Sequence, residues 1–496
     1  MKLRALLQFF AGLLVCLLGL FLARRQAFEV RTVLSTAGGC QMATDFYQPT
    51  AGTPLGYVVL LHGLAANKTV MAFNAEEFAN LGLRVFVPDL PGHGRTPGPF
   101  SPARDESCAL DFVRDLAARH AILPERTILA GHSLGAAIAI RVAAKFPVAG
   151  VIAISPAPMH SAPGFTAEMI PFHDAPKLPP HSLVLTGQWE PGPIKSLAEQ
   201  LVASSGDPSS KYLMIPHTTH VSVMFSSETF SAIRSWSSAV LGSKSYSPIP
   251  KNMPALGCLL GILGLAILAP PFLREMHPAV EPAPAPAALP SVTAWIGVAL
   301  VAVLLAGLTP PFRFLHLFEG DYLAGFLFFM GLLVLANRRA SWPPPRDFVT
   351  PRSLSAAASA LLLVLLFGGW FEITFYEAWP TITRWLRFPL LFLCFLPWHL
   401  AEELFLGEPV SSLSVPRILK ALALRAILWT AMLLGVLFLH SGEILLFLLV
   451  AYFVVFSILE RLAADLVRFR THSAAAAAIF GAILLAAFAL AIFPVA

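Results

Sequence analysis

Long uncharged apolar runs constrain the structure of this chain more than any other feature of its sequence. Nearly all of them lie before residue 23 or after residue 254. Several are close to the length that a helix needs to cross the hydrocarbon core of a bilayer. Of the 496 residues, 56% are hydrophobic and only 13% are charged, a combination that is rare in soluble domains. The sequence therefore predicts a membrane protein whose middle segment is more polar.

Nine membrane-crossing helices are expected from these runs. Residues 1–25 are interpreted as an uncleaved signal-anchor helix, because basic residues flank the apolar run on both sides and no small-residue cleavage site follows it. Residues 246–254 form a polar, proline-bearing linker, and residues 255–496 are expected to be an all-α membrane domain of about eight helices. These eight spans are expected near 255–273, 292–308, 322–337, 355–376, 385–400, 420–439, 443–459 and 474–493.

The middle segment, residues 26–245, has the charge and length of an ordinary globular domain. Strand-like and helix-like patterns alternate along it, which predicts a mostly parallel sheet with helices on both faces. Residues 156–181 are rich in proline and lack periodicity, so we expect a short cap there. Strands are expected at 57–61, 84–87, 127–130, 148–154, 182–186 and 211–215, and helices near 72–81, 105–120, 194–204 and 221–241.

A serine stands between a strand-like and a helix-like pattern in residues 127–137, TILAGHSLGAA. Gly131 and Gly135 lie two residues before and two after Ser133, so a sharp turn can form there without Cβ clashes. Such a turn exposes the serine hydroxyl above the sheet. The helix that follows directs backbone N–H groups at developing negative charge. The pattern is typical of a nucleophilic serine.

The remaining parts of a serine hydrolase site follow other predicted strands. Leu64 follows the strand at 57–61, so its backbone N–H can pair with that of Leu134 as an oxyanion hole. Glu190 and His220 follow the strands at 182–186 and 211–215. Because the carboxyl ends of parallel strands meet at one edge of a sheet, we expect these residues to lie near Ser133. The order serine, acid, base is the one expected for this architecture.

With these motifs, residues 28–242 resemble the α/β-hydrolase superfamily, within it the serine aminopeptidase and monoacylglycerol lipase-like branch. The motifs are His62-Gly63, Asp89-x-Pro-Gly-His-Gly94, Gly131-His-Ser-Leu-Gly135, Gly187-x-x-Glu190 and His220. The resemblance implies that Ser133 is the nucleophile, His220 the base and Glu190 the acid. One departure is that this acid is usually an aspartate.

Alternatives exist for two members of this triad. Asp207 or Asp174 are candidates for the acid in place of Glu190, and His217 lies three residues before His220. The histidines of the motifs, His62, His93 and His132, are expected to shape loops by hydrogen bonds. No cofactor and no metal are expected, since the five cysteines fit no metal-binding spacing. We expect Cys40 and Cys108 to be unpaired buried thiols, with a disulfide as the alternative if this domain is extracytoplasmic.

The distribution of basic residues predicts the orientation of the spans. Alternate loops of the membrane half are richer in arginine and lysine, and the positive-inside rule places these loops in the cytoplasm. Counting back puts the globular domain on the extracytoplasmic side of an inner or plasma membrane, although Arg24, Arg25, Lys244 and Lys251 argue against it. The basic residues that carry the count are Arg338, Arg339, Arg346, Arg352, Arg417, Lys420, Arg425, Arg461, Arg468 and Arg470.

Ionisable residues also occur within the apolar half. His399, Glu402 and Glu403 lie at the end of one predicted span and Glu443 beside another. Charges at membrane depth are costly and often functional. His399 and Glu402 share a helix face, which suits a metal site or a proton relay. The alternative, which we favour, is that these are interfacial residues at helix ends.

Two classes of function are compatible with the sequence. One is a membrane-bound serine hydrolase that cleaves an acyl ester, lipid or amide substrate by way of an acyl-enzyme. The other is a polytopic transporter or lipid-handling membrane protein with a hydrolase-like domain that only binds. The presence of serine, histidine and acid together favours the first. The expected partners are a small acyl or lipid substrate and the lipid bilayer, and nucleic acid is not expected because the net charge is only +5.

Overall fold

The contacts within the chain define two compact units. The structure, a computed structural model, describes residues 2–23, 29–49, 53–160, 170–242, 253–280, 292–308, 315–336, 342–439 and 445–496. The first unit, here called the helical unit, comprises Met1–Ala23, Ala255–Thr374 and Ala378–Phe493. The second, the sheet unit, comprises Arg24–Pro254, Phe375–Glu377 and Pro494–Ala496. The sheet unit thus includes two three-residue segments that are remote from it in sequence.

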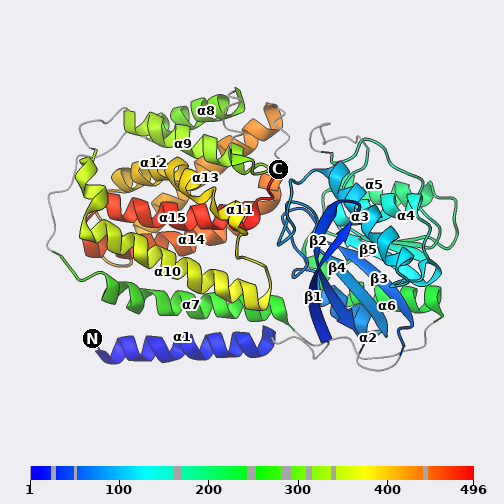
Figure 1. Ribbon diagram of the computed structural model, residues 1–496. Coiled ribbons are helices and arrows are strands. Elements are labelled where there is room, and N and C mark those ends of the chain that lie inside the picture. The colour runs from blue at the N-terminus through cyan, green and yellow to red at the C-terminus, as the bar shows by residue number, and fades with distance from the viewer. Residues whose placement is uncertain are drawn as a thin grey trace. The chain divides into compact units, whose positions relative to one another are not determined.

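An eight-stranded sheet forms the centre of the sheet unit (Figure 1). Its strand order is β1-β2-β4-β3-β5-β6-β7-β8. The pairs β1–β2 and β2–β4 are antiparallel, and every other neighbouring pair is parallel. The strands are β1 (Glu29–Ala37), β2 (Cys40–Gln48), β3 (Gly56–Leu61), β4 (Leu83–Pro88), β5 (Thr127–His132), β6 (Gly150–Ile154), β7 (Ser182–Gly187) and β8 (Lys211–Ile215).

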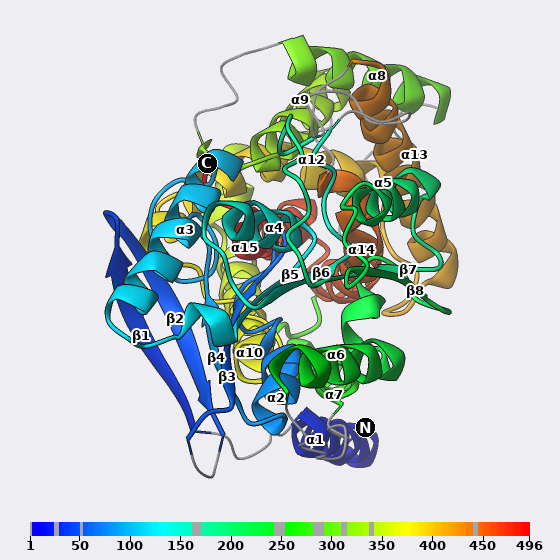
Figure 2. The same ribbon diagram turned by 90° about the vertical axis from the view of Figure 1, so that its right-hand side faces the viewer.

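Helices cover both faces of this sheet (Figure 2). One face carries α2 (Ala72–Asn80) and α6 (Ser227–Leu241), and the other carries α3 (Pro102–Ala118), α4 (Leu134–Lys145) and α5 (Gly192–Ala203). Strands β5, β6 and β7 are buried along their whole length, because side chains on both faces of such a strand pack under helices. The predicted fold class, a mostly parallel sheet with helices on both faces, is confirmed.

The β1–β2 hairpin is absent from the strands predicted above, which begin at residue 57. Its turn contains Gly38 and Gly39, both with positive φ (55° and 80°). Positive φ at both central residues is what a type I′ hairpin turn requires, and glycine adopts it without strain. This Gly-Gly pair between two nine-residue segments is the local signal that would have predicted the hairpin.

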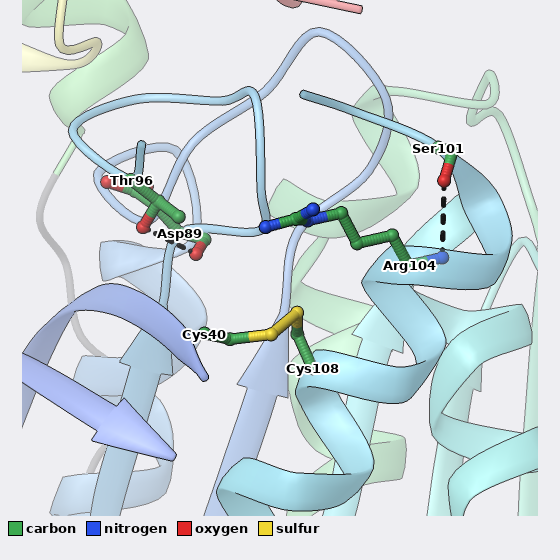
Figure 3. The surroundings of a disulfide bond; sticks show 6 residues. All are labelled: Cys40, Asp89, Thr96, Ser101, Arg104 and Cys108. Atoms are coloured by element: carbon green, nitrogen blue, oxygen red, sulfur yellow. Dashed lines mark hydrogen bonds between the residues drawn. A yellow bond between two sulfur atoms is a disulfide. The ribbon is translucent and has the colours of Figure 1, made fainter. Parts of the chain in front are cut away.

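A disulfide joins Cys40 at the start of β2 to Cys108 in α3 (Figure 3). The expectation of two unpaired buried thiols is therefore wrong. The spacing of 68 residues gave no hint of the pairing. Sheet and helix packing brings the two Cα atoms to 5.7 Å, which is an ordinary separation for a disulfide.

Removing this disulfide is expected to destabilise the sheet unit. A cross-link that closes a loop of this length restricts the unfolded chain by about 4 kcal/mol. The double variant Cys40→Ala/Cys108→Ala should therefore melt at a lower temperature than the parent, as measured by fluorescence-detected unfolding in detergent. Reductant should lower the midpoint of the parent in the same direction and leave that of the double variant unchanged. Equal midpoints for parent and variant would show that the bond contributes nothing.

Seven helices within the described residues are long and apolar enough to cross a membrane, which indicates a membrane protein. Each of the nine apolar runs identified in the sequence contains a helix. Two of these helices, α8 and α9, are apolar but shorter than the other seven and are not among the candidate membrane spans. The helices of this unit are α1 (Lys2–Ala23), α7 (Pro254–Met276), α8 (Val292–Leu308), α9 (Gly320–Ala336), α10 (Pro351–Thr374), the one-turn α11 (Ile382–Trp385), α12 (Phe388–Leu406), α13 (Val415–Phe438), α14 (Leu445–Thr471) and α15 (Ala474–Ile492).

The helical unit contains a buried ion cluster on α12, α13 and α14. Four arginines and four carboxylates, each at most 7% exposed, pair with one another. Arg461, for example, is fully buried and contacts Glu402, Glu403 and Asp465. We call the following residues the ion cluster: Glu402, Glu403, Arg417, Arg425, Glu460, Arg461, Asp465 and Arg468.

This cluster bears on two expectations from the sequence. His399, Glu402 and Glu403 lie in the last two turns of α12 and are at most 2% exposed, so they pack inside the helical unit. Glu443 lies outside the described residues. The four arginines of the cluster were also counted as loop charges in assigning the orientation. The structure places them within α13 and α14, in contact with buried carboxylates, and not in loops. No group of side chains suited to a metal ion occurs in the described part of the chain.

Candidate active site

Ser133 occupies a strained turn between β5 and α4. Its φ is 53° and its ψ is −118°, a conformation that a non-glycine residue adopts only at a cost. A Cβ on Gly131 would lie 2.4 Å from the backbone of Gly135, and a Cβ on Gly135 would lie 2.4 Å from the carbonyl oxygen of Leu61. Only glycine fits at either position. The backbone N–H of Ser133 donates to Ile154 on β6 (2.9 Å), which attaches the turn to the sheet.

The three residues predicted to form a triad lie in one chain of hydrogen bonds. The Oγ of Ser133 is 3.0 Å from Nε2 of His220, and Nδ1 of His220 is 3.2 Å from Oε2 of Glu190. Both distances are within hydrogen-bonding range. The His220 ring is 14% exposed and the Glu190 side chain is fully buried. This geometry suits a nucleophile, a base and an orienting acid.

Two further donors hold the carboxylate of Glu190. The hydroxyl of Ser155 and the backbone N–H of Gly187 (2.6 Å) both donate to Oε1, which leaves Oε2 for His220. Burial by itself would raise the pKa of Glu190, but the His220 contact and these two hydrogen bonds together lower it below its usual value. The carboxylate is therefore ionised at neutral pH. The stability that these contacts provide is present above the ordinary glutamate pKa and is lost as the pH falls through the lowered pKa.

The sequence analysis did not identify Ser155 as a residue of the site. It directly follows β6, at the same edge of the sheet as the predicted site residues, and its φ of 47° marks another strained position. The rule that selected Glu190 and His220, a polar residue just beyond a parallel strand, would also have selected Ser155.

The predicted oxyanion-hole residues, Leu64 and Leu134, stand on either side of this site. Leu134 is the first residue of α4, so its N–H has no partner within the helix. Leu64 lies in the loop after β3. A Cβ on Gly63 would be 3.1 Å from Cβ of Ser133, so this loop passes directly beside the serine. Neither amide donates a hydrogen bond to another group in the described part of the chain.

The alternative triad members lie elsewhere. His217 is exposed and its ring contacts Trp189. Asp207 accepts hydrogen bonds from His181, Ser209 and Ser210 in a surface turn. Asp174 pairs with Arg141. These three are the substitutes considered above, and the structure brings only Glu190 and His220 to Ser133.

The histidines of the other motifs make hydrogen bonds that hold loops. His62 links Gly63 and Leu90, since Nδ1 is 2.8 Å from the Gly63 oxygen and Nε2 accepts from the Leu90 N–H at 2.9 Å. Nε2 of His132 is 2.7 Å from the carbonyl oxygen of His220. Burial lowers the pKa of His132 to about 3, so this ring is neutral and donates from Nε2. His132 thus positions the backbone of the candidate base.

A buried lysine organises the loop that follows Leu64. The Lys68 ammonium contacts Asp89 at 3.0 Å and also Glu377, and its backbone N–H donates to Asp89 at 2.7 Å. Burial opposes the charge of Lys68, but these carboxylates raise its pKa. Tyr376, the neighbour of Glu377, donates its hydroxyl to the carbonyl oxygen of Ala65 at 3.0 Å. The segment Phe375–Glu377 therefore supports the loop that carries one predicted oxyanion donor.

Replacing Lys68 by methionine is expected to destabilise the sheet unit by about 3–5 kcal/mol, because Asp89 would stay buried without its counter-charge. For a domain of this size the loss lowers the thermal midpoint by about 10 °C. The midpoint is measured on the full chain in detergent. Lys177→Met, at an exposed lysine of the same unit, serves as the control and should melt like the parent. A Lys68→Met variant that melts like the parent would exclude a stabilising role for this lysine.

Only part of the expected cap is described. Residues 161–169 lie outside the described residues. Ile170 and Phe172 are 4% and 5% exposed, and Phe172 packs under the guanidinium of Arg141 at 4.5 Å. The described part of this segment therefore packs on the sheet unit.

Residues 58–251 match the model of the alpha/beta hydrolase family. A monoacylglycerol lipase from Mycolicibacterium smegmatis is 35% identical to this chain over 114 residues, which are 22% of this chain and 40% of that protein. An uncharacterized protein from Mycobacterium tuberculosis is 26% identical over 208 residues, 38% of this chain and 71% of that protein. The match thus spans less than half the length of the lipase.

Among solved structures, an esterase/lipase from an uncultured bacterium is 20% identical to this chain and has a TM-score of 0.35. The similarity covers 45% of this chain and 87% of that one. Together, the family match and the sheet topology define an α/β-hydrolase fold in the sheet unit, combined in this chain with a helical region that contains several apolar helices.

Proposed function

We propose that this protein is a membrane-bound serine hydrolase that cleaves an acyl ester, lipid or amide substrate. The observation that carries the proposal is the hydrogen-bond chain from Ser133 through His220 to Glu190. The family match of residues 58–251 and the similarity to a monoacylglycerol lipase support a hydrolase.

In the proposed mechanism, Nε2 of His220 accepts the proton of Ser133 as Oγ attacks the acyl carbonyl carbon. The carbonyl oxygen becomes an oxyanion that the N–H groups of Leu64 and Leu134 receive. Glu190 holds the ring in the tautomer with hydrogen on Nδ1 and stabilises its positive charge. His220 then gives the proton to the leaving group, and an acyl ester on Ser133 remains. Water, deprotonated by the same ring, releases the acid and restores the serine.

The disulfide supports an extracytoplasmic position for the sheet unit in the same proposal. Structural disulfides form and persist in oxidising compartments and are rare in the cytosol. After denaturation without reductant, a maleimide should modify Cys16, Cys258 and Cys394 only, since these three are free. With reductant, all five cysteines should react. Modification of Cys40 in unreduced protein from native membranes would contradict this location.

Labelling with a fluorophosphonate tests the proposed chemistry directly, because such probes react with serines activated as nucleophiles. The folded full chain in detergent should be labelled, and the labelled peptide should contain Ser133. The same chain after heat unfolding is the control and should not react. Absence of labelling in the folded protein would favour the alternative function, a transporter or lipid-handling protein with a binding-only domain.

A further inference from the structure

The helical unit contains a cavity of about 40 Å³ that belongs to none of the chemistry described above. This volume holds about three water molecules. Its wall comes from α9, α12, α13, α14 and α15, and it is almost entirely aliphatic and aromatic. The exceptions are His399, Arg425 and Ser457.

The charge of Arg425 is already neutralised. Its guanidinium donates to both oxygens of Glu402 at 2.7 Å and lies 2.6 Å from Glu460. A carboxylate or phosphate in the cavity would face these two buried carboxylates as well as the single arginine. The cavity therefore disfavours an anionic ligand.

His399 is the polar group of the cavity that lacks a partner. It is 2% exposed, and its Nε2 makes no hydrogen bond within the described residues. Its other nitrogen, Nδ1, lies 3.9 Å from Oε1 of Glu460. Gly481 on α15 makes room for this pair, because a Cβ there would lie 2.5 Å from Nδ1 of His399 and 2.6 Å from Oε1 of Glu460.

The neighbouring carboxylate decides which nitrogen carries the hydrogen. The negative charge of Glu460, 3.9 Å from Nδ1, favours the neutral tautomer with its hydrogen on Nδ1, which leaves a lone pair on Nε2. A buried acceptor without a donor is costly. A ligand that offers a hydrogen-bond donor, has no charge and is otherwise apolar therefore fits this site.

We propose that this cavity binds the hydroxyl head of a neutral lipid, such as a long-chain alcohol or an acylglycerol, with the hydroxyl donating to Nε2 of His399. The cavity accommodates the head and the adjoining carbons, not a whole lipid. Trp429 and Phe456 are the only half-buried residues of its lining, so the chain leaves past these two rings, between α13 and α14. This site is separate from Ser133 and does not depend on hydrolysis.

A photoreactive alcohol tests the site on the full chain in detergent micelles. The probe is hexadecanol with a diazirine in its chain and a terminal alkyne. The protein carries Ser133→Ala, so that hydrolase activity plays no part in the result. We expect saturable labelling of peptides from α12, α13 or α14. The concentration of unlabelled hexadecanol that displaces half of the probe should be about tenfold lower than the corresponding concentration of hexadecyl methyl ether. The ether has the same chain but no hydrogen-bond donor.

Substitutions at His399 give the second measurement. His399→Phe keeps a ring without an acceptor and should weaken labelling about tenfold, whereas His399→Gln keeps an acceptor and should retain most of it. His277→Phe is the matched control, since Nε2 of this other buried histidine already lies 3.0 Å from the hydroxyl of Ser359. The probe should label this variant as strongly as the parent. Equal displacement by alcohol and ether, or labelling confined to other helices, would overturn the proposal. If His399→Phe does not fold, the comparison of alcohol with ether on the parent background still tests whether the ligand donates a hydrogen bond.

Discussion

Replacing Ser133 by alanine is expected to lower kcat for hydrolysis of a p-nitrophenyl ester by about 10⁶-fold. The hydroxyl is the only group of the proposed triad that forms a bond to the substrate. Without it, His220 has no nucleophile to deprotonate, since its Nε2 faces Oγ at 3.0 Å. The assay uses the purified full chain in detergent and follows release of p-nitrophenolate.

The variant should fold like the parent, because alanine removes one hydroxyl from a residue whose backbone bond to Ile154 stays intact. Ser204→Ala is the matched control at an exposed serine of the same unit, and its turnover should equal that of the parent. Unchanged turnover by a folded Ser133→Ala protein would remove the serine from the mechanism and leave the sheet unit as a binding domain.

Replacing Glu190 by glutamine is expected to lower kcat by about 10⁴-fold, close to the effect known for an uncharged isostere of a triad acid. Two donors, the Ser155 hydroxyl and the Gly187 N–H, point at Oε1. The glutamine must therefore keep its carbonyl oxygen there and turn its NH₂ toward His220. That NH₂ donates to Nδ1, so the ring hydrogen moves to Nε2, which can then no longer accept the proton of Ser133.

This reasoning predicts a loss in kcat with little change in KM, since Glu190 does not touch the substrate in the proposed mechanism. Fluorophosphonate labelling of Glu190→Gln should slow in parallel. Glu228→Gln, at an exposed glutamate in α6, is the control and should behave as the parent does. A loss smaller than tenfold would show that another group orients the ring.

The elbow and the strand ends that surround it were predictable from local sequence. Both glycines fit the local signature of a sharp turn. A Cβ on Gly131 would meet Gly135, four residues further on, whereas a Cβ on Gly135 would meet Leu61 on β3, so the second restriction is confirmed only by the tertiary structure. Leu64, Glu190 and His220 each follow an apolar strand, and parallel strands bring their carboxyl ends together in any sheet of this class. The geometry agrees with these predictions, and the roles of the residues are what the experiments above test.

Other features depend on contacts between distant segments. The Cys40–Cys108 bond joins residues 68 positions apart, and Lys68 pairs with Glu377, about three hundred residues further along the chain. The arginines of the helical unit are a third case. In the sequence Arg425 and Arg461 resemble loop charges that report membrane orientation, yet each lies against buried carboxylates on another helix. The charge of a residue can be read from the sequence, whereas the position of its counter-charge depends on how distant segments pack.

The sequence by itself determined that this chain combines a sheet unit with apolar helices. It also determined the sharp turn at Ser133 and the order in which the acid and the base follow this serine. These properties depend on hydrophobic period, glycine placement and strand ends, which act over a few residues. Only the tertiary structure decided which donors hold Glu190, which cysteines pair, and that His399 faces an apolar cavity with an unpaired nitrogen. Hydrogen bonds, disulfides and ion pairs act over a few ångströms, so they depend on which side chains the folded chain brings together.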